Sequence, residues 1–266
     1  MLLASLAPRR RALVLGVVAL VLVLAGAAAV GALTGRRSTP APQAMPGPVV
    51  LVPGYGGSPA GLQTLAQRLR REGRQVEFVA LPDRGVGDLR RAAEALDEVV
   101  TRLEDGGAPS VDVVGYSAGG VTARVWVRAH DGARRARRIV TLGSPHHGTT
   151  LAAAADAALG GCDEQCEQLQ PGSSLLAQLN RGDETPDGPV WVSVWTEVDE
   201  TVVPPDSGRL ADAIDVRLQD VCPRSRVSHG ALPRDPAVVG IVVAALGPAE
   251  PVAPRKGDCE RYAAAA

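Results

Sequence analysis

Short apolar runs alternate with amphipathic segments from Val49 to Leu246, and this alternation is the main structural signal of the sequence. Most of the apolar runs are rich in β-branched residues and lack a polar face, as expected of strands buried on both sides. The predicted strands are 49–52, 75–80, 111–114, 138–142, 190–196 and 213–218, and the predicted helices are 59–72, 87–104, 120–130, 151–159 and 236–246. This order predicts an α/β fold with a mostly parallel sheet and helices on both faces.

The alternation is interrupted between Ser144 and Pro189, a stretch far longer than an ordinary connection between a strand and a helix. We expect an insert over 145–189 that contains an alanine-rich helix. Long inserts on this side of a parallel sheet commonly build the substrate site. The alternative is a surface excursion that makes no contact with ligand.

The first 37 residues follow a different pattern. The arginines at 9–11 precede an uncharged apolar run over 12–33. At the rise of an α-helix, this run is long enough to cross the hydrocarbon core of a bilayer. We therefore predict that residues 1–37 form either an uncleaved signal-anchor or a signal peptide cut near Ala29, and either one would export the rest of the chain.

Residues 38–48 are expected to form a proline-rich linker that is extended and has no packing potential. The folded domain should then occupy 49–266, with a tail over 248–266. Its charges are interspersed, the net charge is −1, and aromatic residues make up only 3% of the chain. A nucleic-acid partner is therefore not expected, because such partners need a basic or base-stacking surface. We expect a monomer.

One motif in this pattern carries chemistry. The strand that begins at Val111 runs into Gly115-Tyr-Ser117-Ala-Gly119 and then into a helix-compatible segment, which is the context of a nucleophile elbow. In such a turn the serine has a strained backbone, and its hydroxyl stands clear of the sheet at a helix N-terminus. Glycine is needed two residues away on either side, since side chains there would collide. The alternative is a glycine-rich turn with an inert serine.

A nucleophilic serine needs a base, and the chain has only four histidines. His229 is the sole histidine beyond the last predicted strand, where the Ser…Asp/Glu…His order typical of this elbow places the base. His130 ends the elbow helix, where a cation would favour the helix C-terminus. His146 and His147 follow the strand that ends at Leu142, and they either line the site or hold its loop.

The acid that orients the base should follow the penultimate strand. Asp199 lies there, just after 190–196. Its carboxylate would fix the tautomer of the imidazole and stabilise the imidazolium. Glu197 and Glu200 are near enough to be alternatives, and Asp206 is a more distant one. A surface acidic cluster is the simpler interpretation for all of them.

An oxyanion hole needs two backbone N–H donors. We assign one donor to Ala118, the residue after the serine. The other is assigned to Tyr55, because it lies in the glycine-rich loop 54–57 after the first strand, where the backbone can approach a substrate. The alternative for this loop is a plain tight turn.

Together these motifs resemble those of small bacterial secreted triacylglycerol lipases and esterases of the α/β-hydrolase fold (class 2 lipase-like). The resemblance covers about 49–246 and runs through Val52-Pro-Gly-Tyr-Gly-Gly57, Gly115-Tyr-Ser-Ala-Gly119, Leu142-Gly-Ser-Pro-His-His-Gly-Thr149, Asp199-Glu-Thr-Val-Val-Pro204 and His229. Its most specific stretch is Ser-Pro-His-His-Gly-Thr. The resemblance implies an α/β-hydrolase fold, a serine triad and carboxylic-ester substrates. One difference matters: Pro53 stands where such lipases usually have a histidine, which leaves the support of the first loop open.

Four cysteines in an exported domain suggest two disulfides. We expect Cys162–Cys166 within the insert and Cys222–Cys259 between the tail and the loop that carries His229. No histidine lies at zinc-ligand spacing from these cysteines, so no metal site is expected. The predicted chemistry requires no cofactor.

The sequence therefore predicts a serine ester hydrolase of the triacylglycerol lipase or carboxylesterase type that acts outside the cytoplasm, either secreted or anchored through 12–33. Its substrate would be a lipid or a small ester, and its catalytic residues would be Ser117, His229 and Asp199. One alternative is an acyltransferase that uses the same triad on a cell-envelope acceptor. Another is a non-catalytic envelope-binding protein on the same scaffold, which Pro53 favours and the complete triad opposes.

Overall fold

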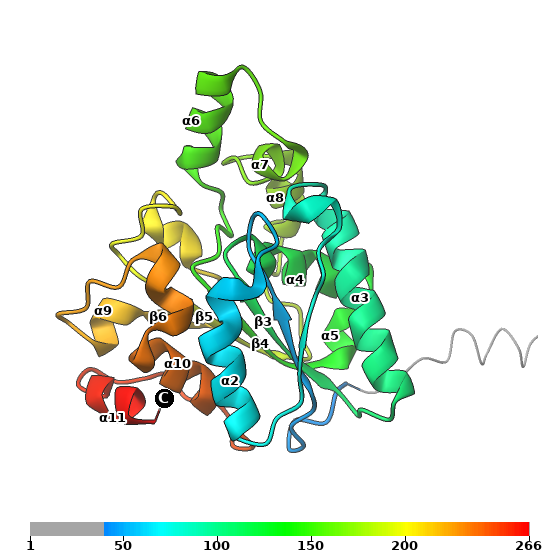
Figure 1. Cartoon of the computed structure of the whole chain (residues 1–266), viewed down its shortest axis with the longest axis vertical. Coiled ribbons are helices and arrows are strands. Elements are labelled where there is room, and N and C mark those ends of the chain that lie inside the picture. Colours follow the sequence, from blue (N-terminus) through cyan, green and yellow to red (C-terminus); the bar gives the residue numbers. More distant parts are fainter. Residues whose placement is uncertain (1–39, 266) are drawn as a thin grey trace, which may run out of the picture. The chain divides into compact units, whose positions relative to one another are not determined.

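The computed structural model describes residues 40–265 (Figure 1). The predicted signal-anchor or signal peptide, 1–37, lies outside the described residues. Within residues 40–265, none of the helices combines the length and the apolar character that a membrane crossing requires.

Six parallel strands form one sheet in the order β2-β1-β3-β4-β5-β6. The strands are β1 (Val49–Val52), β2 (Val76–Phe78), β3 (Val111–Tyr116), β4 (Ala136–Leu142), β5 (Val190–Trp195) and β6 (Ile214–Arg217). Gly115 near the end of β3 pairs with Val52 of β1 and with Thr141 of β4. The carboxyl ends of these strands are therefore level with one another and form a common edge.

Helices cover both faces of the sheet, as predicted. One face packs against α2 (Gln63–Arg71), α10 (Pro236–Ala245) and α11 (Cys259–Ala264), and the other against α3 (Leu89–Asp105), α4 (Ala118–Ala129) and α8 (Ser174–Leu179). Successive residues of β1 supply both cores, because strand side chains alternate between faces. The remaining short elements are η2 (Pro59–Leu62), η3 (Pro82–Gly85), α5 (Gly132–Arg135), η4 (Pro205–Gly208), α9 (Leu218–Val221) and η5 (His229–Arg234).

The insert contains α6 (Thr150–Leu159), α7 (Glu164–Gln168) and α8. Of these, α6 matches the predicted alanine-rich helix and stands at the top of Figure 1, away from the sheet. The four cysteines pair as expected: Cys162–Cys166 closes the turn between α6 and α7, and Cys222–Cys259 ties α11 to the end of α9. The tail is thus not a loose extension, because α11 also buries Tyr262 in the core.

Residues 40–48 were predicted to lack packing contacts, and this prediction is wrong. Ala41 is only 4% exposed. The amide of Gln43 donates to the carbonyl of Gly188 at 3.1 Å and accepts from Arg138 at 2.6 Å. A buried guanidinium such as that of Arg138 needs hydrogen-bond acceptors, and Gln43 of the proline-rich segment supplies one.

Asp112 and Arg137 form a fully buried ion pair at the amino edge of the sheet. Two guanidinium nitrogens of Arg137 donate to the Asp112 carboxylate at 2.9 and 2.7 Å, and Arg74 approaches the same carboxylate. Arg137 also donates to the carbonyl of Leu246 at 2.6 Å. Because every charge here has an opposite charge and hydrogen bonds, the burial cost is offset. The pair joins β3, β4 and the end of α10 on the side opposite the carboxyl edge.

Candidate active site

Ser117 occupies the turn between β3 and α4 with φ 55° and ψ −126°, a strained conformation for a residue with a side chain. A Cβ placed on Gly115 would lie 2.5 Å from Gly120, and one on Gly119 would lie 2.2 Å from the carbonyl oxygen of Val52. Both positions therefore require glycine, for the steric reason that the sequence predicted. This geometry is that of a nucleophile elbow.

The structure brings Ser117, His229 and Asp199 together. The Oγ of Ser117 lies 3.0 Å from Nε2 of His229, and Nδ1 of His229 lies 2.8 Å from Oδ2 of Asp199. An ionised carboxylate only accepts, so the proton lies on Nδ1 and Nε2 is free to accept from the serine hydroxyl. All three residues are less than a tenth exposed. The three groups form a continuous hydrogen-bonded chain that is mostly buried.

Two neighbouring acids have different roles in this geometry. The other oxygen of Asp199 accepts from the backbone N–H groups of Thr201 at 2.9 Å and Val202 at 2.7 Å, which fixes the carboxylate. Glu200 instead accepts from the backbone N–H of His229 at 3.2 Å. Of the acids that the sequence offered, Asp199 thus contacts the imidazole, whereas Glu200 holds the histidine's backbone. Glu197 pairs with Arg217 at the surface.

Two residues that the sequence analysis did not single out for such a role support His229. The hydroxyl of Tyr116 donates to the His229 carbonyl at 3.2 Å, and the two rings lie 5.2 Å apart. Burial, aided by the negative charge of Asp199, raises the pKa of Tyr116 to about 12, so its hydroxyl stays a donor. Gly143 has φ +54°, and a Cβ there would lie 3.1 Å from Nδ1 of His229. A glycine directly after a buried strand was the available signal for Gly143.

The loop after β1 lies against the nucleophile. A Cβ on Gly54 would lie 2.9 Å from the Cβ of Ser117, so only glycine permits this approach. In the described part of the chain, the backbone N–H groups of Tyr55 and Ala118 donate no hydrogen bond to another backbone group. Two free donors next to a serine are the requirement for an oxyanion hole. Pro53 does not prevent the loop from reaching Ser117.

The first part of the domain matches a known protein family. Residues 48–180, half of the chain, match the family described as palmitoyl protein thioesterase. The chain belongs to the palmitoyl protein thioesterase family. The matched range contains the Gly54 loop and Ser117, whereas Asp199 and His229 lie beyond it. No curated protein matches the chain.

Solved structures show which fold this member of the palmitoyl protein thioesterase family adopts. Aspergillus fumigatus lipase B aligns with a TM-score of 0.70 at 18% identity, over 82% of this chain and 56% of that one. The propeptide form of Bacillus licheniformis lipase BlEst2 aligns with a TM-score of 0.59 at 20% identity, over 74% and 48%. The chain thus spans about half the length of these lipases. The comparison confirms the predicted α/β-hydrolase fold.

The other histidines of this family member do not contact the triad. His146 is fully buried, bonds to Thr141 at 3.1 Å, and its carbonyl accepts from Asn180 at 3.0 Å. Burial, together with the positive charge of Arg124, holds the pKa of His146 well below its usual value of 6.5. It therefore holds its loop as a neutral ring. His130 ends α4, 3.8 Å from Asp97.

His147 pairs with Glu184 at 3.0 Å on the wall of a cavity of about 750 Å³. This cavity is lined by residues of 147–150 and 204–215 together with Pro171 and Glu184, but not by Ser117, Asp199 or His229. Its volume alone is therefore no argument for a substrate site. Among residues 40–265, no three His, Cys, Asp or Glu side chains are grouped in a way that could hold a metal ion.

Proposed function

We propose that this protein is a serine hydrolase that cleaves carboxylic esters or acyl thioesters through a covalent acyl-enzyme. The observation that carries the proposal is the hydrogen-bonded chain from Ser117 through His229 to Asp199, with 3.0 and 2.8 Å between the atoms that would exchange or hold protons. Both distances are within the range over which a serine, its base and an orienting acid cooperate.

In the first half of the reaction, Oγ of Ser117 attacks the carbonyl carbon while Nε2 of His229 takes the hydroxyl proton. Asp199 accepts from Nδ1 and stabilises the imidazolium that results. The negative charge that develops on the carbonyl oxygen is held by the N–H groups of Tyr55 and Ala118. The tetrahedral intermediate then breaks its bond to the alcohol or thiol, which receives the proton from His229.

In the second half, water takes the place of the leaving group. His229 removes a proton from this water, the resulting hydroxide attacks the acyl carbon, and the proton returns to Ser117 as the free acid leaves. No cofactor takes part in these steps, because the three side chains and two backbone donors supply the base, the nucleophile and the charge stabilisation.

Two lines of support bear on the substrate. The matched family is described as palmitoyl protein thioesterase, and the aligned neighbours are described as lipases. Both classes of substrate present an acyl carbonyl to the nucleophile and differ in the leaving atom. We therefore propose an acyl chain of lipid type, attached through oxygen or sulfur. The two disulfides support action outside the cytoplasm, where such bonds persist.

The test is turnover of a series of p-nitrophenyl esters from acetate to palmitate, and of a palmitoyl thioester, by the full-length chain. We expect turnover that disappears in Ser117→Ala and labelling of Ser117 by a fluorophosphonate. An added acceptor alcohol separates hydrolysis from acyl transfer, since transfer would yield a new ester in place of the free acid. Absence of both turnover and labelling would overturn the proposal in favour of a non-catalytic binding protein.

A further inference from the structure

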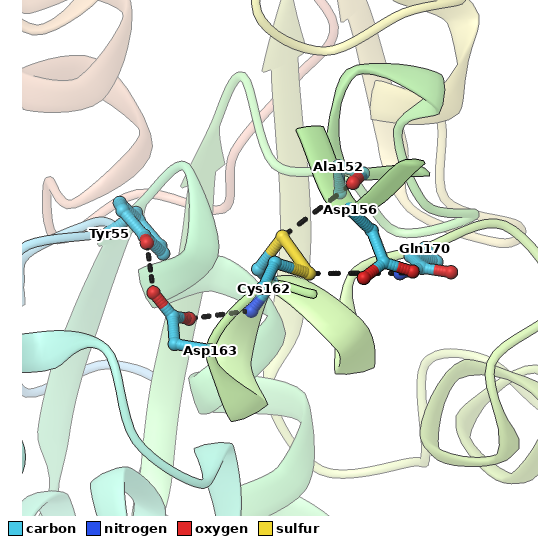
Figure 2. The surroundings of a disulfide bond; sticks show 7 residues. Tyr55, Ala152, Asp156, Cys162, Asp163 and Gln170 are labelled. Atoms are coloured by element: carbon cyan, nitrogen blue, oxygen red, sulfur yellow. Dashed lines mark hydrogen bonds between the residues drawn. A yellow bond between two sulfur atoms is a disulfide. The ribbon is translucent and has the colours of Figure 1, made fainter. Parts of the chain in front are cut away.

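A single hydrogen bond links the loop beside Ser117 to the insert. The phenol of Tyr55 donates to the carboxylate of Asp163, although the two residues are 108 positions apart in the chain (Figure 2). Tyr55 belongs to the loop after β1, and its backbone N–H is one of the two proposed oxyanion donors. Asp163 belongs to the turn between α6 and α7. The contact therefore joins the loop after β1 to a segment that contains no residue of the triad.

The loop around Tyr55 is rich in glycine and depends on its hydrogen bonds to keep its conformation. Gly54, Gly56 and Gly57 flank Tyr55, and glycine restricts the backbone less than any other residue. Two backbone hydrogen bonds hold the loop: the N–H of Gly57 donates to the carbonyl of Gly54 at 3.0 Å, and the N–H of Gly56 donates to the carbonyl of Gly85 at 2.8 Å. The phenol of Tyr55 adds a side-chain hydrogen bond, to Asp163.

Asp163 is well placed to fix the phenol, because several interactions hold Asp163 itself in place. It caps α7: its second carboxylate oxygen accepts from the N–H of Cys166 at 3.0 Å. The disulfide Cys162–Cys166 closes the turn around it, as Figure 2 shows. The helix is docked on the main domain through Gln168, whose amide donates to Asp88 at 2.7 Å and accepts from the N–H of Leu89 at 2.8 Å.

We propose that Asp163 is a positioning residue for the oxyanion hole, and that it acts by accepting the hydrogen bond of the Tyr55 phenol while the Cys162–Cys166 disulfide holds it in place. This inference rests on the proposed function, because it assigns the Tyr55 N–H to the oxyanion. The insert then contributes to turnover through one side chain.

Two physical points determine the expected effect. The hydrogen bond to Asp163 raises the pKa of Tyr55 to about 12, so the phenol remains a donor throughout the neutral range. Tyr55 is 54% exposed, so water competes for the bond, and loss of the bond should loosen the loop without unfolding it. Misplacement of an oxyanion donor slows turnover more than it weakens substrate binding.

The experiment compares kcat and KM of the full-length chain with those of Tyr55→Phe, Asp163→Asn and the double variant. We expect each single variant to lower kcat about tenfold with KM nearly unchanged, since a small misplacement of a catalytic group costs rate. The double variant should be no slower than the singles, because both remove the same bond. A trifluoromethyl ketone, whose adduct with serine carries an oxyanion, should bind more weakly in the same proportion.

Asp156→Asn is the matched control. Asp156 is also an insert carboxylate beside the disulfide, but its partner is Gln170 at 3.1 Å and it does not contact Tyr55 (Figure 2). Its kcat should equal that of the native chain. A chain with both Cys162→Ser and Cys166→Ser should lose about as much kcat as Asp163→Asn. Combining these changes with Asp163→Asn should lower kcat little further.

The inference is overturned if the native chain turns over and labels at Ser117 while Tyr55→Phe and Asp163→Asn are as active as Asp156→Asn. Equal losses in kcat and in ketone affinity for all three carboxylate and phenol variants, Asp156→Asn included, would also overturn it by pointing to general damage to the insert. A native chain without Ser117-dependent turnover would instead contradict the proposed function itself.

Discussion

The triad and the insert both lie at the carboxyl edge of the sheet, but they are held in place very differently. Ser117, His229 and Asp199 are each less than a tenth exposed, and each is fixed through backbone strain, excluded side-chain volume or several hydrogen bonds. In the insert, α8 is buried in the core, whereas α6 exposes nearly half of Leu151 and the adjoining turn bonds to the loop after β1 through the phenol of Tyr55. If the proposed roles hold, substitutions at Ser117, His229 or Asp199 should abolish turnover, whereas substitutions in the outer part of the insert should only reduce it.

The largest expected effect tests whether Asp199 alone orients the imidazole of His229. Asp199→Asn should lower kcat by about a thousandfold or more, because an amide at that position favours the wrong imidazole tautomer. Glu200→Gln is its matched control: the adjacent residue keeps an acceptor for the backbone N–H of His229 and should change kcat by less than about threefold. Steady-state kinetics on the same ester distinguish the two. Equal losses would mean that the adjacent acids share the orienting role.

The second effect concerns tolerance to added volume in the two regions. Gly119→Ala should lower the free energy of unfolding by about 3 kcal/mol, because the new methyl group would meet the Val52 carbonyl at 2.2 Å. Gly172→Ala in the insert should cost only about 1 kcal/mol, since no atom lies within 4 Å and only its φ of +76° is unfavourable. Urea denaturation measures both. A cost at Gly172 as large as that at Gly119 would show that the insert is packed as rigidly as the elbow.

The smallest effect is a pH dependence of stability that originates at the buried His146. His146 has a pKa well below 6.5 in the folded protein, whereas in the unfolded chain it titrates near that value. As the pH falls below 6.5, the unfolded chain binds a proton that the folded protein does not, so stability falls by at most about 1.4 kcal/mol per pH unit for this one group. Its contribution is intact above pH 6.5.

Thermal unfolding between pH 5 and 8 checks this expectation in the native chain and in His146→Asn. The variant should lose the part of the slope that belongs to His146. His147→Asn, in which the neighbouring half-exposed ring is replaced, should keep that part. If His146→Asn retains the full slope of the native chain, the acid sensitivity has another origin.

Much of the fold and of the candidate site could be predicted because it depends on local sequence patterns and on the order of elements along the chain. The positions of the strands along the chain followed from apolar runs, and the elbow followed from the two glycines that flank Ser117 in the motif. Asp199 and His229 followed from their place after particular strands. These features depend on chain order, which the sequence states directly.

What could not be predicted depends on contacts between distant segments. The support of His229 by Tyr116 joins residues 113 positions apart, and that of Tyr55 by Asp163 joins residues 108 apart. Residues 40–48 were judged from their proline content, which predicts extension but says nothing of the buried Arg138 that bonds to Gln43. In each case the partner is set by the folded sheet and has no signal in the local sequence.

The anchoring of Gln43 has a practical consequence. Its partners Gly188 and Arg138 lie just before β5 and near the beginning of β4, at the amino edge of the sheet, whereas Ser117 follows the end of β3 at the other edge. At the rise of a strand, the two edges are about 20 Å apart. A bead, surface or fused domain coupled ahead of this point would be joined on the side away from the nucleophile. Immobilisation through that end should therefore leave Ser117 accessible to bulky acylated substrates.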